Sequence, residues 1–147
     1  MRVDGTGGKA GLDDYVWYVR GLLALYQQKG ERKWLQRAEA LSEIQLRLFN
    51  DVTSGGLYES ANDEYLLFRA KSIVDGALPS SNAIAVLNFK RLAELTENKR
   101  WKDTANKIVQ AFVGFINDNP SASATMLGGM TETGPWLAND AGRDIAE

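Results

Sequence analysis

One predicted helix, from about residue 80 to residue 95, is apolar on nearly every side. Residues 81–92 read Ser-Asn-Ala-Ile-Ala-Val-Leu-Asn-Phe-Lys-Arg-Leu and leave no broad polar face. A helix that is hydrophobic all round must be buried on all its faces. The segment from Leu12 to Tyr26 has the same character, because Asp13 and Asp14 open a largely apolar run. The chain is therefore expected to contain two buried inner helices whose polar starts lie at one end of the core.

Each inner helix is followed by a predicted helix with one apolar and one polar face. The helix from about Arg32 to Asn50 places on one face Trp34, Ala38, Leu41, Ile44 and Leu48. The helix from about Lys99 to Asn117 does the same with Trp101, Ala105, Ile108, Phe112 and Phe115. The two halves repeat, since Leu22, Leu25 and Trp34 correspond to Leu92, Leu95 and Trp101, with an offset of 70 residues before the turn and 67 after it.

Two successive hairpins of this kind predict a mostly α fold, a partial α/α toroid with about four main helices. Between them, residues 55–59 and 65–69 flank Asn62-Asp63 and predict a short β-hairpin. An ordinary four-helix bundle is the competing interpretation, because it requires no missing partner. We expect a flexible lead-in over residues 1–11, an αα-hairpin domain over residues 12–130 and a divergent tail over residues 131–147.

Composition excludes several classes of function. The chain has 147 residues, 44% of them hydrophobic, which suits one ordinary domain. Its 17 basic and 19 acidic residues are interspersed, so we expect neither nucleic-acid nor membrane binding. Without cysteine or histidine the chain cannot supply a disulfide, a Ser-His-Asp triad or a thiolate or imidazole metal ligand. We expect no cofactor, no metal and a cytoplasmic location.

Several short motifs along the chain resemble one known family. They are Leu12-Asp13-Asp14-Tyr15, Gly21-Leu22-Leu23, Gly55-Gly56-Leu57-Tyr58, Lys71, Asp75-Gly76-Ala77, Pro79-Ser80 and Asn82. Together they resemble the C-terminal α/α-toroid region of the thioredoxin-domain-containing YyaL/spermatogenesis-associated protein 20 family, over about residues 9–130. The resemblance implies a fold similar to six-hairpin glycosidases, in a family whose biochemical activity is poorly defined. It also implies a fragment that lacks the family's thioredoxin-like domain and most of the toroid.

The candidate ligand site is the end of the core where both inner helices begin. It groups polar residues near two helix starts: Asp13, Asp14, Lys71, Asp75, Ser81 and Asn82. Exposed backbone N–H groups at a helix start suit anions and hydroxyl-rich ligands. Simpler structural roles compete: Asp13 and either Ser80 or Ser81 as helix N-caps, and Asp75 as part of a turn neutralised by Lys71.

Function is less constrained than fold. Asp14 and Asp75 are the candidate catalytic pair, because glycoside chemistry classically uses two carboxylates, but the absence of histidine weighs against catalysis. The sequence favours a non-catalytic interaction or scaffold module. The alternative is a carbohydrate-binding or carbohydrate-active protein whose pocket is completed by oligomerisation. Because part of a ring exposes the flanks of its inner helices, we expect a homodimer or larger assembly, with Trp136 and Leu137 covering exposed surface.

Overall fold

The computed structural model describes residues 10–61 and 68–131. Within these residues the chain forms the helices α1 (Leu12–Lys29), α2 (Arg32–Phe49), α3 (Ser81–Thr96) and α4 (Lys99–Asp118), then a 3₁₀ helix, η1 (Pro120–Ser123), and α5 (Ala124–Met130). The four long helices confirm the predicted ones, the first of which is expected from about Asp13 to about Gln28, to within one residue at each end. Trp136 and Leu137 lie outside the described residues.

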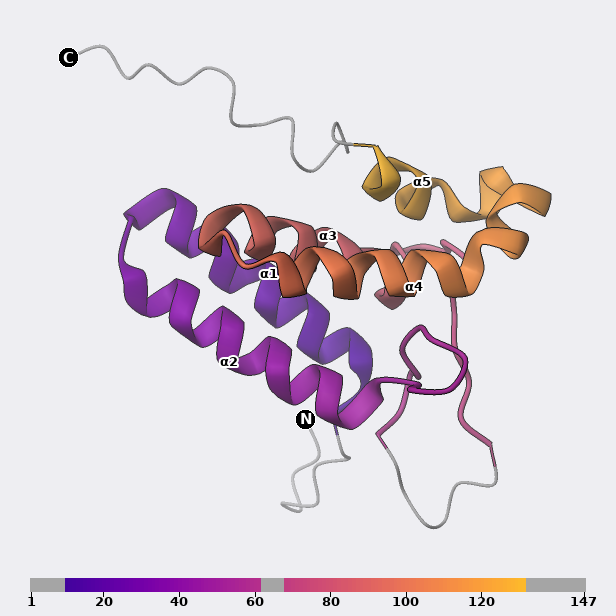
Figure 1. Cartoon of the computed structure of the whole chain (residues 1–147), viewed down its shortest axis with the longest axis horizontal. Helices are drawn as coiled ribbons and strands as arrows, with labels where there is room; N and C mark the ends of the chain where they lie inside the picture. The colour runs from indigo at the N-terminus through magenta and orange to yellow at the C-terminus, as the bar shows by residue number, and fades with distance from the viewer. Residues whose placement is uncertain (1–9, 62–67, 132–147) are drawn as a thin grey trace.

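Short turns fold the four long helices into two hairpins, α1 with α2 and α3 with α4 (Figure 1). Gly30 ends α1 with a φ of +66°, and its N–H donates to the carbonyl of Tyr26 at 2.8 Å. Positive φ is inexpensive only for glycine, so this residue suits the turn. At the second turn the Asn98 side chain accepts from the N–H of Arg100 at 3.0 Å and starts α4.

The inner helices form a row, α1 then α3 then α5, with α2 and α4 outside it. α3 packs against α1, α4 and α5, and its residues 81–89 are all buried. Phe89 of α3 stacks on Trp101 of α4, with ring centroids 5.5 Å apart and an interplanar angle of 6°. The prediction of αα-hairpin packing consistent with an α/α toroid is thus confirmed.

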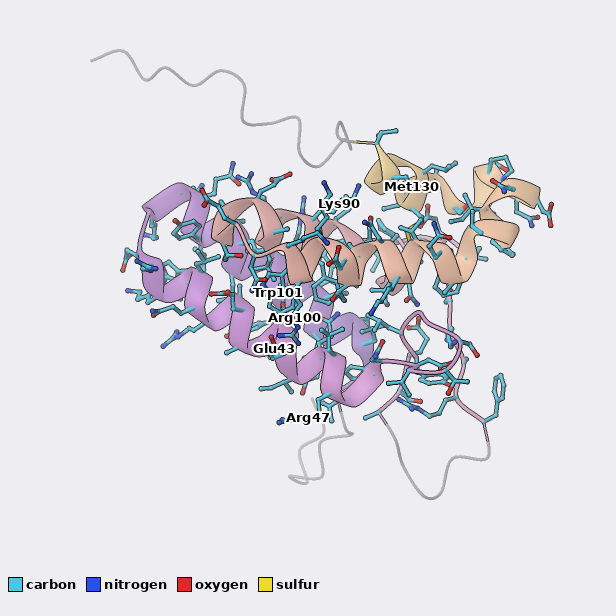
Figure 2. All side chains as sticks on the ribbon, in the orientation of Figure 1. Glu43, Arg47, Lys90, Arg100, Trp101 and Met130 are labelled. Carbon is cyan, nitrogen blue, oxygen red and sulfur yellow. The ribbon has the colours of Figure 1, made fainter. Side chains whose placement is uncertain are left out.

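The two outer helices also meet. Arg100 of α4 and Glu43 of α2 form a bidentate ion pair, with Nη2 2.8 Å from Oε2 (Figure 2). The fully buried residues of α2 are Leu35, Ala38, Ser42, Gln45 and Phe49, and three residues of the predicted face, Trp34, Leu41 and Leu48, pack half-buried against the core. The apolar pattern missed Ser42 and Gln45 because they are polar residues that the fold nevertheless buries.

The described part of the connection between the hairpins, residues 50–61 and 68–80, has no strand, so the predicted β-hairpin is not observed there. A single antiparallel bridge joins Asn50 to Leu57. Gly55 and Gly56 have φ angles of +74° and +76°, which turn the chain back onto the end of α2 instead of extending it. Glu59 donates its N–H to the carbonyl of Ala70 at 2.8 Å. Residues 65–67 of the second predicted strand lie outside the described residues.

α5 was not predicted. Pro120 opens η1 directly after α4, and α5 follows it and packs against α3 (Figure 1). Asp75 fixes the start of α5, because its Oδ2 accepts the N–H of Thr125 at 2.7 Å. No helix in the described part of the chain is both long and apolar enough to cross a membrane.

Candidate functional site

The starts of α1 and α3 meet at Glu59, a residue that sequence reasoning did not select. The backbone carbonyl of Glu59 accepts the N–H of Leu12, the first residue of α1, at 3.0 Å. Its side-chain Oε2 accepts the hydroxyl of Ser81, the first residue of α3, at 3.3 Å. One residue of the connection therefore holds both inner-helix starts together.

Glu59 is also the carboxyl group at this end with a raised pKa. Burial raises the pKa of Glu59 above its ordinary value, and the negative charge of Asp13 adds to that effect. Hydrogen bonds from the Ser72 N–H, at 3.3 Å, and the Ser81 hydroxyl act in the opposite direction. Asp13 itself is exposed in the first turn of α1. Asp13 and Ser81 are thus brought together, through Glu59.

At the start of α1 it is Asp14, and not Asp13, whose side chain bonds the N-cap residue. The N-cap is Gly11, and its N–H donates to Oδ2 of Asp14 at 2.9 Å. The prediction that Asp13 caps this helix is wrong by position, because the helix begins at Leu12, so Asp13 lies within its first turn. Asp14 also borders a shallow depression of about 310 Å³ with Tyr15, Tyr18 and Leu41.

Lys71 belongs to a separate cluster with Asp51 and Tyr58. Its Nζ lies 2.6 Å from Oδ2 of Asp51, and it donates to the carbonyl of Gly55 at 2.7 Å. The Tyr58 hydroxyl donates to the same Asp51 oxygen at 2.8 Å. Oδ1 of Asp51 accepts the N–H groups of Thr53 and Ser54 at 2.9 and 3.0 Å. This cluster closes the turn that follows α2.

The hydrogen bonds of this cluster change the pKa values of Asp51 and Tyr58. Lys71 and the donors of Ser54, Tyr58 and Thr53 hold the pKa of Asp51 well below its ordinary value. The hydrogen bond to Asp51 in turn raises the pKa of Tyr58. The guanidinium of Arg69 lies over the Tyr58 ring, 4.0 Å from its centroid. The sequence analysis did not select Asp51. Its side chain accepts the N–H groups two and three residues further along the chain, which is a typical role of aspartate in a turn.

The side chains of Asp75 and Asn82 form hydrogen bonds with backbone groups. Oδ1 of Asp75 accepts the N–H of Ser80 at 2.9 Å, so this carboxylate braces the starts of both α3 and α5. Asn82 is fully buried and exchanges two hydrogen bonds with the backbone of Leu57, while its amide also donates to the carbonyl of Ser72 at 2.9 Å. Ser80, not Ser81, is the N-cap of α3.

The predicted site residues therefore have different structural roles. Among the described residues, Asp14 and Asp75, the candidate catalytic pair, accept hydrogen bonds from different residues at the starts of different helices. Among the residues that the structure describes, no group of three or more acidic side chains is arranged to hold a metal ion. A cavity of about 760 Å³ lies away from the inner-helix starts, between the turn at residues 50–56 and the α4 side chains Arg100, Thr104 and Lys107.

Comparison with known proteins shows the family of this chain. Residues 15–133 match the model of glycosyl hydrolase family 47. The chain belongs to this family. The chain is also 38% identical over 118 residues to spermatogenesis-associated protein 20 of Rattus norvegicus and 36% identical over 118 residues to the Homo sapiens protein. Both alignments cover 79% of this chain, and the resemblance predicted from the motifs is confirmed. The chain spans about 15% of the length of these relatives.

In the described part of the chain, one flank of α1 is exposed. Its exposed positions recur at helical spacing: Asp14, Tyr18, Gly21, Ala24 and Gln28. Tyr18 is 64% exposed, and a Cβ added at Gly21 would meet no atom within 4 Å. This surface is called the α1 flank, and at Asp14 and Tyr18 it borders Leu41 of α2 across the shallow depression. Asn88 occupies the repeat position of Tyr18 in α3, and it is only 1% exposed.

Proposed function

We propose that this chain is a non-catalytic interaction module of the six-hairpin glycosidase-like fold, and that the α1 flank is its binding surface for another helix. The observation that carries the proposal is the contrast between Tyr18 and Asn88. The two residues stand at equivalent positions of repeated inner helices, but only Asn88 is covered by a neighbouring helix. Tyr18 is an exposed aromatic side chain next to the small residues Gly21 and Ala24, and aromatic side chains are enriched at protein–protein interfaces.

The polar residues at the inner-helix starts support the same proposal. The hydrogen bonds of Asp14, Asp75 and Asn82 are made with backbone groups. Lys71 forms an ion pair with Asp51. A general acid or base must reach a proton on the substrate, so groups fixed in this way are poorly suited to catalysis. Their arrangement suits stabilisation of the helix starts.

A charge placed on the α1 flank tests the proposal. We expect sedimentation velocity to show concentration-dependent association of the unmodified chain and its loss in Tyr18→Glu, because a carboxylate resists burial in an apolar contact. Val52→Glu is the matched control, since Val52 is 89% exposed in the turn after α2, away from the flank. Association that survives Tyr18→Glu unchanged would contradict the proposal, as would equal loss in both variants.

A second candidate function is carbohydrate binding or hydrolysis at the inner-helix starts, in a pocket completed by oligomerisation. The observation that favours it is the pair Asp13 and Glu59, one carboxyl group exposed and one with a raised pKa, in a chain of a glycosyl hydrolase family. Calorimetric titration with a panel of neutral oligosaccharides tests it. Saturable heat that disappears in Glu59→Gln would favour this function over the interaction module.

The cytoplasmic location stays a prediction. Fractionation of cells that express the chain, followed by immunodetection, would test it.

A further inference from the structure

We propose that the cavity beside the turn at residues 50–56 binds a small organic anion with an apolar body, such as a medium-chain carboxylate. This cavity lies between that turn, the end of α2 and the first half of α4, and no residue of α1 lines it. The proposal therefore concerns a site separate from the α1 flank and goes beyond the interaction module. The volume of the cavity, about 760 Å³, is typical of small-molecule sites in proteins.

One wall of the cavity is the turn itself, whose backbone is held in place. The N–H of Asp51 donates to the carbonyl of Gly56, and the N–H of Gly55 donates to the carbonyl of Asp51, both at 3.0 Å. Lys71 donates to the carbonyl of Gly55 at 2.7 Å. Gly55 also lies against α4 so closely that an added Cβ would be 3.0 Å from Cβ of Ala111. This wall is thus formed before a ligand enters, which lowers the entropic cost of binding.

The lining of the cavity combines apolar and polar side chains. Leu46 of α2 is half-buried and Ile108 of α4 is buried, and both contribute apolar surface. Most of the exposed side chains that line the cavity are polar, among them Asn50, Ser54 and Gln110. Small-molecule sites commonly combine an apolar surface with a few polar groups that orient the ligand. The lining therefore suits a ligand with an apolar body and one polar end.

The charges of the lining determine the sign of that polar end. Three charged side chains line the cavity, Asp51, Arg100 and Lys107. Each carboxylate oxygen of Asp51 already accepts from two groups, and both terminal nitrogens of Arg100 donate to Glu43 (Figure 2). Among the described residues, no carboxylate pairs with Lys107. The positive charge of Lys107 is therefore the one left for a ligand, and it favours an anion over a cation.

Fluorescence titration with anilinonaphthalenesulfonate tests the site, because this probe joins an apolar body to one anionic group. We expect saturable binding of one probe per chain, with an affinity about tenfold lower in Lys107→Gln, since a hydrogen bond to a charged group is lost. Lys102→Gln is the matched control, because Lys102 is exposed on the same helix and does not line this cavity. Circular dichroism and urea unfolding first show that each variant is folded like the unmodified chain.

Competition identifies the class of ligand. Hexanoate should displace the bound probe, whereas hexanol, which has the same chain without the charge, should not do so at the same concentration. Equal displacement by the two compounds would overturn the selection of an anion. Equal loss of affinity in Lys107→Gln and Lys102→Gln would overturn the site, because it would indicate a general attraction of anions to the protein. Absence of saturable binding would overturn it as well.

The Tyr18→Glu variant separates this proposal from the interaction module. We expect it to bind the probe as the unmodified chain does. Probe binding that is lost in Tyr18→Glu but kept in Lys107→Gln would place the probe on the α1 flank and overturn the anion site alone. Probe binding that depends on Lys107, in a chain that shows no association by sedimentation velocity, would support the anion site and overturn the interaction module.

Discussion

Asn82 is hydrogen-bonded to both backbone groups of Leu57: its Oδ1 accepts the Leu57 N–H at 2.8 Å, and its Nδ2 donates to the Leu57 carbonyl at 2.9 Å. The pair joins the first turn of α3 to the connection that follows α2. Since both residues are completely buried, these groups have no water to replace a lost partner.

Removing this amide should destabilise the fold. We expect Asn82→Ala to lower the free energy of unfolding by about 3 kcal/mol, because buried backbone groups of Leu57 and Ser72 lose their partners. Urea unfolding followed by circular dichroism measures the change. Asn106→Ala, at an exposed position of α4, is the control and should stay within about 0.5 kcal/mol of the unmodified chain. Similar losses in both variants would contradict the assignment.

Gly56 cannot be replaced without strain. Its φ is +76°, and an added Cβ would lie 2.8 Å from the ring of Phe112, so Gly56→Ala should cost about 2 kcal/mol or more. Gly114→Ala is the opposite case, because Gly114 lies within α4 with no atom near an added Cβ. That variant should gain about 0.5 to 1 kcal/mol. Thermal unfolding of the two variants in parallel would show shifts of opposite sign.

The cluster of Asp51 with Lys71 and Tyr58 should make the protein sensitive to acid. The pKa of Asp51 is lower in the folded chain than its ordinary value of 3.8. A depressed carboxyl pKa stabilises the fold above 3.8, and this contribution is lost as the pH falls from that value toward the folded pKa. We expect Asp51→Asn to reduce the fall in urea midpoint between neutral pH and about pH 3. An unchanged fall would show that other carboxylates govern acid unfolding.

Glu59 should behave in the opposite way. Burial raises its pKa above the ordinary 4.5, so the charged form costs stability at neutral pH and protonation relieves that cost as the pH falls through the folded pKa. Glu59→Gln keeps an oxygen for Ser81 and removes the charge. We therefore expect this variant to unfold at higher urea than the unmodified chain at neutral pH, and the difference to shrink as the pH falls through the raised folded pKa toward 4.5. A variant less stable at neutral pH would contradict this account.

Asp75 should control the attachment of α5. Its carboxylate accepts from Ser80 and from Thr125, and Asp75→Ala removes both bonds. Amide hydrogen exchange should accelerate in residues 124–130 by more than in α1, because local opening releases the element that loses its anchor. Equal acceleration throughout the chain would indicate global destabilisation instead.

The sequence predicted the helices well because their periodicity is a local property. The apolar residues of the segment 81–89 predicted a helix buried on all sides, and α3 is buried over this stretch. The buried face of α2 was predicted less well, since Ser42 and Gln45 are polar by type but buried by their place in the hairpin. The β-hairpin was predicted from composition, whereas the turn at Gly55 and Gly56 directs the chain to α2 and Asn82.

The sequence predicted polar residues at both inner-helix starts, but not the residue that joins these starts. Asp13 and Ser81 do lie at neighbouring helix starts, yet Glu59, which links them, comes from the middle of the connection. Its role depends on the path of residues 50–61, which no local pattern fixes. Likewise, the partnership of Asp51 with Lys71 joins residues 20 positions apart in the sequence and arises only when the connection folds back.

The solution mass of the chain, from light scattering after size exclusion over a hundredfold range of concentration, tests the central claim most directly. An interaction module that uses the α1 flank predicts a mass of two copies at high concentration and a return toward one copy on dilution. A mass of one copy, constant across the whole range, would contradict that claim.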